Sequence, residues 1–475
     1  MKRKTIIIGC GLAGLAIIIA AAYFFLLAEP AKLQTSGRLV DGRWTQKGLK
    51  QAQRGNQIIL TPNQLPPSRA PFYIDKTQAI IGQGFTFMDY VSEKQSVFYR
   101  FNLSLDKVEK LFTLKENIDG GIVTDEGRGL LYRGMIASTD LEGYLYYQTK
   151  TRPLKKLLSR CNWYGVSPDR RTVVANGIAN GQPSEGSRRV YLIRLKQGSV
   201  TRLPEATCPD DLEKLITFNC SWSSDSRYFL IEGKVFDATT GVLVKDFNQN
   251  AARSSMFSWS PTGDQLAFAI QTPANAQYLV TEEHHDLLLS DQIGIFNPAD
   301  QSLRSLPLDA DLATALCWNQ EGDQLAVMAL PQTAASAYIN NANGANHVDR
   351  LDLLIVDVAQ LTATKRLTKL PLIDLKVFTN GLVVYSRLYG NKLGIAGLDL
   401  SNGRSKRLIP DDALLLKVFK GQAVLTTSHG LYQVQSDLDI ANIASYDEEG
   451  DFAYYPEWRK LVIGYDDRIV IMKLK

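Results

Sequence analysis

Histidine and cysteine are scarce in this chain of 475 residues, which contains four His and five Cys. No Cys or His pair has the close spacing of a zinc site, and we expect no metal or other cofactor. The motif Gly-x-Ser-x-Gly is missing, so a serine hydrolase with a nucleophile elbow is unsupported. The glycine-rich run at residues 9–14 lies in an apolar segment without a preceding strand, which argues against a phosphate-binding loop.

An excess of charge is also missing. Lys and Arg total 53 and Asp and Glu total 49, and three of the basic residues are Lys2, Arg3 and Lys4. The rest of the chain is therefore almost neutral. Because nucleic-acid binding depends on a basic surface, we expect no nucleic-acid partner. Apolar residues make up 45% of the chain, which suits a globular protein with a hydrophobic core.

The N-terminus carries one long apolar segment. Residues 5–28 contain no charged side chain and follow the three basic residues. As a helix they would be about 36 Å long, and a bilayer core is about 30 Å thick. We predict a signal-anchor transmembrane helix over 1–28, with a cytoplasmic N-terminus and an extracytoplasmic body, in the cell membrane. A cleaved signal peptide is the alternative, since Ala20–Ala22 suits a cleavage site.

Residues 29–78 are polar and contain five prolines, which predicts a stalk. Its one short apolar piece, at residues 57–60, is a candidate strand. The segment at 446–474 supplies only three strands by its pattern, and a sheet with an open edge is prone to unwanted pairing. We therefore expect 57–60 to add the fourth strand and bring the two chain ends together.

Two short patterns repeat through the body of the chain. The first is an apolar strand, a tight turn of Ser, Pro, Asp or Gly and a second apolar strand. Its clearest copies begin at Val166, Trp222, Trp259 and Trp318. We expect the leading Trp or Val to pack between neighbouring sheets.

The second pattern is a strand, a few turn residues and a strand that ends in Leu or a similar residue. Strong copies begin 42 to 60 residues apart, at Phe101, Tyr147, Ile193, Phe236, Phe296, Val356 and Leu398, with weaker copies at Leu431 and Ile469. Two hairpins per repeat make a four-stranded sheet, and a ring of such sheets buries both faces of each. We predict an all-β propeller over 79–475, with about eight four-stranded blades and a range of seven to nine.

The turn motifs resemble the WD-repeat-like propeller repeat of TolB-type proteins. The resemblance implies a propeller that binds proteins or peptides, often in the bacterial envelope. TolB itself carries a separate α/β domain, for which this chain has no room. The resemblance therefore does not imply the role of TolB.

Two repeats are enlarged, and the extra residues of both fall between the second and third strands, at 272–291 and 331–350. The blade connection at 204–217 and the shorter loop at 179–189 emerge on the same face. Because loops on a rigid scaffold often bind, we expect this face to bind a partner. The candidate residues are Glu282, Glu283, His284, His285 and Asp286 of the first loop, Tyr338, Asn341, Asn343 and His347 of the second, and Asp210 and Asp211 of the connection.

The acidic and histidine residues at 282–286 also invite a metal interpretation. Consecutive side chains cannot all point at one ion, so we expect a solvated loop and no metal. Cys208 and Cys220 are twelve residues apart across a loop, which makes them a candidate disulfide in an oxidising compartment.

The function predicted from the sequence is a protein- or peptide-binding or scaffold module of the cell envelope, and no catalytic residue is assigned. One alternative is a structural subunit of a larger envelope complex. The other is a propeller hydrolase or lyase, whose active site would gather residues from many blades and leave no motif in the sequence.

Overall fold

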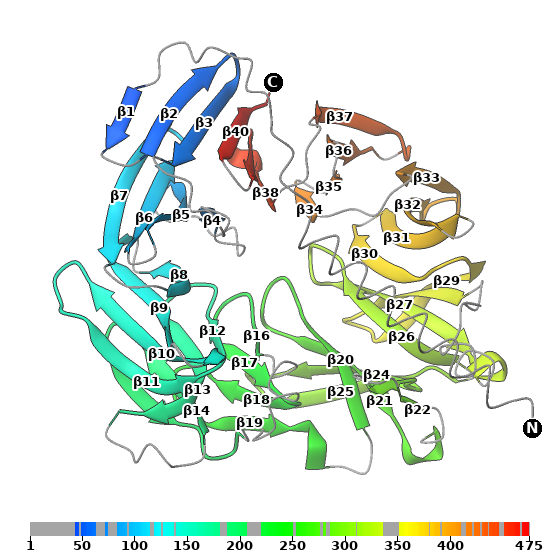
Figure 1. The fold of residues 1–475 in the computed structure, drawn as a ribbon. Coiled ribbons are helices and arrows are strands. Elements are labelled where there is room, and N and C mark those ends of the chain that lie inside the picture. Colours follow the sequence, from blue (N-terminus) through cyan, green and yellow to red (C-terminus); the bar gives the residue numbers. More distant parts are fainter. Residues whose placement is uncertain are drawn as a thin grey trace, which may run out of the picture. The chain divides into compact units, whose positions relative to one another are not determined.

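The computed structural model divides the chain into two units, Met1–Gly42 and Arg43–Lys475, and describes only the second. Within that unit it describes all residues except 47–48, 63–71, 75–82, 93–94, 115–117, 125–126, 137–138, 181–187, 207–219, 250–252, 276–278, 282–285, 310, 336–350, 380, 390–391, 410–414, 420–421, 428–429, 436, 446–450, 466–467 and 475. Figure 1 shows its strands in chain order.

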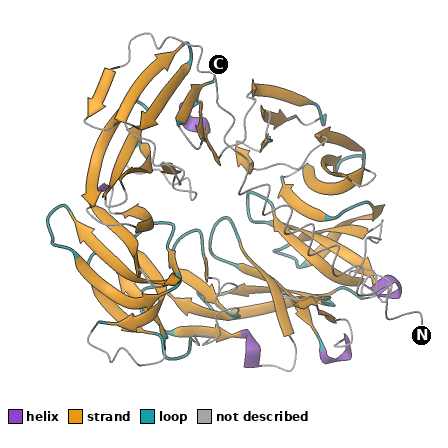
Figure 2. Ribbon diagram, viewed as in Figure 1, coloured by secondary structure: helices purple, strands orange, loops and turns teal. Residues whose placement is uncertain are grey.

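The described residues form antiparallel sheets, and the short helices are minor (Figure 2). We number the blades in chain order. The strands of blades 1 to 4 are, for blade 1, β4 (Phe72–Ile74), β5 (Gly84–Ser92), β6 (Gln95–Asn102) and β7 (Lys107–Leu114); for blade 2, β8 (Ile118–Thr124), β9 (Gly129–Ile136), β10 (Thr139–Thr149) and β11 (Lys155–Cys161); for blade 3, β12 (Tyr164–Val166), β13 (Thr172–Ala179), β14 (Arg189–Arg194) and β15 (Ser199–Arg202); and for blade 4, β16 (Cys220–Trp222), β17 (Tyr228–Ile231), β18 (Lys234–Asp237) and β19 (Leu243–Asp246).

The remaining blades follow the same order. Their strands are, for blade 5, β20 (Arg253–Trp259), β21 (Leu266–Gln271), β24 (Gln292–Asn297) and β25 (Ser302–Pro307); for blade 6, β26 (Asp311–Trp318), β27 (Gln324–Pro331), β28 (Leu351–Asp357) and β29 (Thr362–Leu370); for blade 7, β30 (Asp374–Phe378), β31 (Leu382–Tyr389), β32 (Lys392–Asp399) and β33 (Ser405–Ile409); for blade 8, β34 (Leu415–Phe419), β35 (Gln422–Thr426), β36 (Gly430–Val434) and β37 (Ile440–Ser445); and for blade 9, β38 (Asp451–Tyr455), β39 (Lys460–Gly464), β40 (Ile469–Lys473) and β3 (Gln57–Pro62).

A few elements lie outside this scheme. The strands β2 (Leu49–Arg54) and β1 (Arg43–Gln46) continue blade 9 beyond β3, and β22 (Leu279–Thr281) pairs with β23 (Asp286–Leu288) as a separate hairpin. A short pairing of β11 with β13 joins the sheets of blades 2 and 3. The 3-10 helices are η2 (Phe247–Gln249), η3 (Pro273–Asn275) and η4 (Pro456–Trp458).

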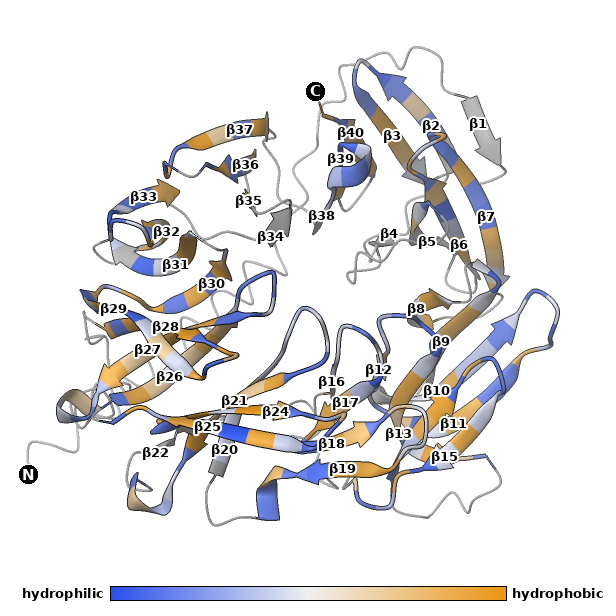
Figure 3. Ribbon diagram, turned by 180° about the vertical axis from the view of Figure 1, so that it is seen from behind, coloured by the Kyte–Doolittle hydropathy of each residue, from blue (hydrophilic) through white to orange (hydrophobic). Residues whose placement is uncertain are grey.

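The core consists of apolar layers between successive blades. Each of the nine layers lies between two adjacent blades, and the ninth joins blade 9 to blade 1. The layer between blades 6 and 7 also takes in Leu289 from the long loop of blade 5. The middle strands are the most buried, as in β24, whereas the outer strand β25 is mostly exposed. Figure 3 shows how hydrophobic and hydrophilic residues are distributed along the strands. A closed circuit of four-stranded sheets is the arrangement of a β-propeller.

The blade count corrects the prediction of eight, because the described residues form nine blades and nine is the upper end of the predicted range. Every copy of the second repeat, strong or weak, lies in the third strand of a blade, including Leu431 in β36 and Ile469 in β40. The two weak copies lack a Ser-Pro-Asp-Gly turn before them. Each is nevertheless a full blade.

The N-terminal predictions have mixed outcomes. No helix among the described residues is long and apolar enough to cross a bilayer, and the anchor predicted over 1–28 lies outside those residues. The segment predicted over 29–78 as a stalk with a possible closing strand contains β1 to β4, between residues 43 and 74, and the stalk itself stays a prediction. The strand β2 escapes sequence analysis because Ala52 is its only side chain described as buried, which leaves no apolar alternation.

Blade 9 joins strands from the beginning and the end of the described unit. As expected from the sequence, β3 pairs with β40, with Ile58 opposite Ile471 and Ile59 opposite Val470. Ile58 and Leu60 are buried in the layer between blades 9 and 1. The closing strand therefore contributes both backbone hydrogen bonds and apolar packing.

An ionic cluster reinforces this closure. The carboxylate of Asp106, in the turn between β6 and β7, binds the ammonium groups of Lys460 and Lys473, the latter at 2.6 Å. Lys460 is buried and also donates to the carbonyl of Leu103. Burial opposes ionisation of Asp106, but the two lysines outweigh this and hold the pKa of its carboxyl below the ordinary value of 3.8.

Leu60→Ala should lower the free energy of unfolding by about 2–5 kcal/mol, because it leaves a cavity in the closing layer. Ile59→Ala is the matched control, since Ile59 lies on the same strand but is only half buried. Urea unfolding of both variants measures the difference. Equal losses of stability in the two variants would contradict this role of β3.

Asp106→Asn should destabilise the protein by about 1–2 kcal/mol at neutral pH, because it leaves Lys460 buried without its counter-charge. A carboxyl with a lowered folded-state pKa stabilises the fold above its ordinary pKa and loses this effect as the pH falls through the folded value. The difference between wild type and variant should therefore shrink below about pH 4. Urea unfolding at a series of pH values measures it. Asp374→Asn, at an exposed ion pair, is the control, and a difference independent of pH would refute the assignment.

Candidate binding face

The antiparallel strand order gives the propeller two different faces. The turns between strands one and two, and between three and four, emerge on one face, which we call the turn face. The loops between strands two and three, and the connections between blades, emerge on the other, which we call the long-loop face. Both enlarged loops, between β21 and β24 and between β27 and β28, lie on the long-loop face.

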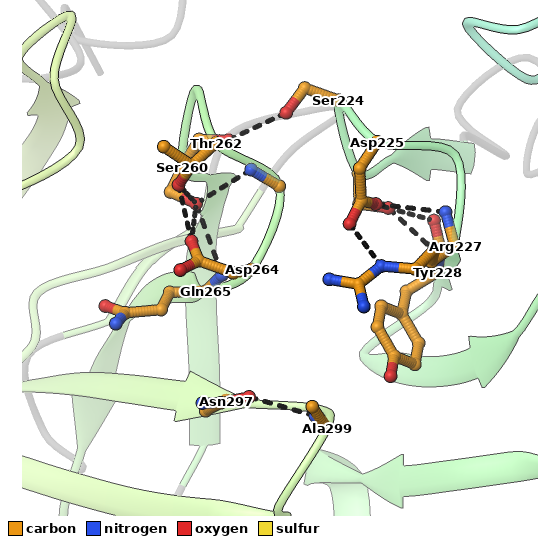
Figure 4. Close-up of polar contacts among 12 residues, drawn as sticks. Ser224, Asp225, Arg227, Tyr228, Ser260, Thr262, Asp264, Gln265, Asn297 and Ala299 are labelled. Carbon is orange, nitrogen blue, oxygen red and sulfur yellow. Dashed lines mark hydrogen bonds and ion pairs between the residues drawn. The ribbon is translucent and has the colours of Figure 1, made fainter.

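The turn face is built from short, internally bonded turns. In blade 4, Ser223 Oγ donates to Asp225 Oδ1 at 2.7 Å and accepts from the Tyr228 N–H at 2.9 Å. In blade 5, Ser260 Oγ donates to Asp264 at 3.0 Å and accepts from two backbone N–H groups (Figure 4). Ser167 of blade 3 and Asn319 of blade 6 have the same role. The repeated Ser-x-Asp and Asn signals are therefore turn chemistry.

Neighbouring turns also bind one another. Ser224 Oγ donates to the carbonyl of Pro261 at 2.6 Å, and the Asp169 N–H donates to Ser226 Oγ at 3.0 Å. Gly263 has a φ of +82°, and a Cβ there would lie 2.7 Å from the Asp225 nitrogen. Close contact between turns leaves little space for insertions, so the turn face is a tightly packed framework.

The tryptophans pack between blades as predicted. Trp259 Nε1 donates to the Ser221 carbonyl of blade 4 at 3.2 Å, and Trp318 Nε1 donates to the Ser258 carbonyl of blade 5 at 3.0 Å. Each indole thus ties the innermost strand of its own blade to the innermost strand of the preceding blade. The repeat seen in the sequence is a repeat of inter-blade contacts.

The first long loop is fastened at its base by Asp291. Its carboxylate accepts hydrogen bonds from the Thr272 N–H at 2.8 Å, from Thr272 Oγ1 at 2.6 Å and from Asn275 Nδ2 at 2.9 Å. Burial opposes ionisation, but these hydrogen bonds outweigh it and lower the pKa of Asp291. Beyond this base, β22 and β23 form a hairpin in which Thr281 pairs with Asp286. The hydrogen bonds of Asp291 to Thr272 and Asn275 thus hold the two ends of the loop together.

The second long loop has an ionic base. Arg366 on β29 binds Asp311 of β26 at 2.8 Å and Asp352 of β28 at 2.6 Å. Both carboxylates are buried, and the hydrogen bonds to Asp352 and Asp311, together with their charge, raise the pKa of the guanidinium. At the start of the loop, Ala335 is buried in the layer between blades 6 and 7. Both loops therefore leave the propeller from rigid positions.

Most of the predicted binding residues lie outside the described residues. These are Asp210, Asp211, Glu282, Glu283, His284, His285, Tyr338, Asn341, Asn343 and His347. Asp286 is the first residue of β23, and only its backbone is described. No group of three or more potential metal ligands occurs in the part of the chain that the structure describes.

The described cysteines, Cys161, Cys220 and Cys317, form no disulfide among themselves. Cys208 lies outside the described residues, so its pairing with Cys220 stays a prediction. Burial raises the pKa of Cys220, and burial together with the charge of Asp374 raises the pKa of Cys317 to about 11. Because reactive cysteines have lowered pKa values, neither thiol is activated.

Sequence analysis missed a cationic cluster on blade 7. Arg387 and Tyr389 end β31 at the long-loop face, and Arg407 lies on β33. The guanidinium carbons lie 4.6 and 4.2 Å from the centre of the tyrosine ring. Because Tyr385, Arg387 and Tyr389 are two residues apart on one strand, the sequence indicates that their side chains lie on the same side of the sheet. The meeting with Arg407 depends on strand register, which the sequence does not reveal.

No family model matches the chain, and no curated protein matches it. Similar solved structures include dipeptidyl peptidase 4 of Porphyromonas gingivalis (15% identity, TM-score 0.46, covering 83% of this chain and 56% of the peptidase). Others are the β-propeller domain of the Trilobed protease from Pyrococcus furiosus (13%, 0.34, 70% and 99%) and a putative TolB from Agrobacterium tumefaciens (15%, 0.25, 59% and 92%). At these scores the β-propeller class rests on the sheet order and the closed circuit of layers, and no activity transfers.

Arg366→Gln should lower the free energy of unfolding by about 1–2 kcal/mol, because two buried carboxylates lose hydrogen bonds to a guanidinium that is itself half exposed. Arg404→Gln is the control, since Arg404 is exposed and a change there should cost less than about 0.5 kcal/mol. Guanidinium unfolding measures both variants. If they are equally stable, Arg366 does not anchor the second loop.

Proposed function

We propose that this chain is an extracytoplasmic β-propeller, held in the cell membrane by its N-terminal apolar segment, that binds a protein or peptide through the long-loop face. The observation that carries the proposal is the difference between the two faces. The turn face is tightly interlinked, whereas the long-loop face carries two enlarged loops on adjacent blades, fastened by Asp291 and Arg366.

The fastened bases matter for binding energy. A loop whose ends are held by buried polar contacts loses less conformational freedom when it binds than a loop with free ends. Blades 5 and 6 are neighbours and share one apolar layer, so their loops leave the propeller from one rigid body. A partner could then contact both loops at once. The anchor places the partner in the cell envelope, which fits the apolar run that follows three basic residues.

Loop exchange tests this proposal. Residues 276–288 and 336–350 should be replaced by short turns, which spares the buried Leu289 and Ala335 and the Asp291 network. Partners cross-linked in membranes to the full-length protein are then identified by mass spectrometry. We expect the exchange to abolish partner capture without changing the thermal midpoint.

The control is a variant of the turn face, Lys196→Gln with Glu321→Gln, which changes two exposed side chains. It should retain every partner. Capture that survives loop exchange, or that is lost in the turn-face variant, would show that the wrong face has been chosen.

A further inference from the structure

The cationic cluster of blade 7 is formed by Arg387, Tyr389 and Arg407, and no carboxylate among the described residues pairs with either arginine. Their recorded contacts are with the tyrosine ring. Neighbouring cations do have carboxylate partners: Lys376 binds Asp374, and Lys406 binds Asp439. Two positive charges beside one ring repel each other, and an anion between them would relieve that repulsion.

The cluster also holds buried donors. Arg387 Nε and Tyr389 Oη are shielded from solvent, and no described residue accepts a hydrogen bond from either. Burial raises the pKa of Tyr389, so its hydroxyl keeps its proton at neutral pH. The phenol ring holds the guanidinium groups by cation–π contact and so limits their rotamers. The charged ends are thereby preorganised.

The position of the cluster links it to the long-loop face. Tyr385, four residues before Tyr389 on the same side of β31, is buried in the layer between blades 6 and 7. Tyr385, Arg387 and Tyr389 therefore lie on the side of β31 that faces blade 6, and they extend to the end of this strand at the long-loop face. Blade 6 carries the second long loop, between β27 and β28. A ligand held by the arginines would lie beside that loop's blade.

The chemistry favours a carboxylate. A guanidinium presents a planar fork of donors that matches the two oxygens of a carboxylate group. Attraction to an anionic lipid surface takes about four to eight clustered basic residues, whereas the described side chains of this cluster include two. Nucleic acid would require a broader basic surface, whereas the chain is nearly neutral.

We propose that Arg387 and Arg407 form a carboxylate-binding site that takes an acidic side chain of a partner protein docked on the long-loop face. This inference rests on the proposed function, because it names the chemistry of the partner. It assigns charge recognition to blade 7 and shape recognition to the loops of blades 5 and 6.

The test uses the full chain in detergent and a fluorescent tetraglutamate peptide, with tetraglutamine as the neutral probe. Fluorescence anisotropy should show binding of tetraglutamate that weakens with added salt, and at least about tenfold weaker binding by Arg387→Gln/Arg407→Gln. Arg387→Lys/Arg407→Lys keeps the charge without the fork and should lie between them. Lys406→Gln, at a cation already paired with Asp439, should bind like wild type.

Three results would overturn the inference: wild type does not bind tetraglutamate, tetraglutamine binds equally well, or the double Gln variant keeps full affinity while its thermal midpoint shows that it is folded. Binding of phosphatidylserine vesicles in place of the peptide would also overturn it. The two proposals fail separately. If loop exchange abolishes partner capture but the double Gln variant still binds the peptide, only this inference is contradicted. If partner capture survives loop exchange but peptide binding requires the two arginines, only the proposed function is contradicted.

Discussion

The pairing of β3 with β40 is the contact on which the rest of the structure depends. Each blade buries its faces against its two neighbours, and β3 supplies Ile58 and Leu60 to the layer between blades 9 and 1, so loss of this strand would open that layer. In blade 9 the fourth strand, β3, comes from the beginning of the described unit, and β40 comes from its end. The hydrogen bond from Asn56 to the carbonyl of Lys473 joins residues that are 417 positions apart in the sequence. The free energy of the whole circuit therefore depends on a contact with a high cost in loop-closure entropy.

Once the circuit is closed, the two faces have different freedom. Turns that bind their neighbours, as Ser224 binds Pro261, are constrained by the blade beside them. The first long loop, between the second and third strands of blade 5, is fastened at its base, where Asp291 binds Thr272. The interlinked turns and the long loops therefore lie on opposite faces of the same propeller, as the proposed function requires.

The sequence predicted what repeats and missed what depends on register. The tryptophan turns and third strands recur along the chain, so local pattern was enough to find them, and the apolar run at 57–60 marked the closing strand. The sequence predicted eight blades, and the structure has nine, because the last two repeats lack the Ser-Pro-Asp-Gly turn that marks earlier ones. Arg366 with its two aspartates, and Arg387 with Arg407, come together from strands whose relative register no local pattern records. The ten predicted loop residues outside the described part of the chain remain predictions.

Native-state hydrogen exchange tests the central claim most directly, because it reports the opening free energy of individual segments. If blade 9 closes the circuit, the amides of Ile58–Leu60 and of Val470–Met472 should exchange together and as slowly as the middle strands of blade 6. Rapid exchange at 58–60 beside a protected blade 6 would mean that the propeller is stable without its closing strand, and the account would be wrong.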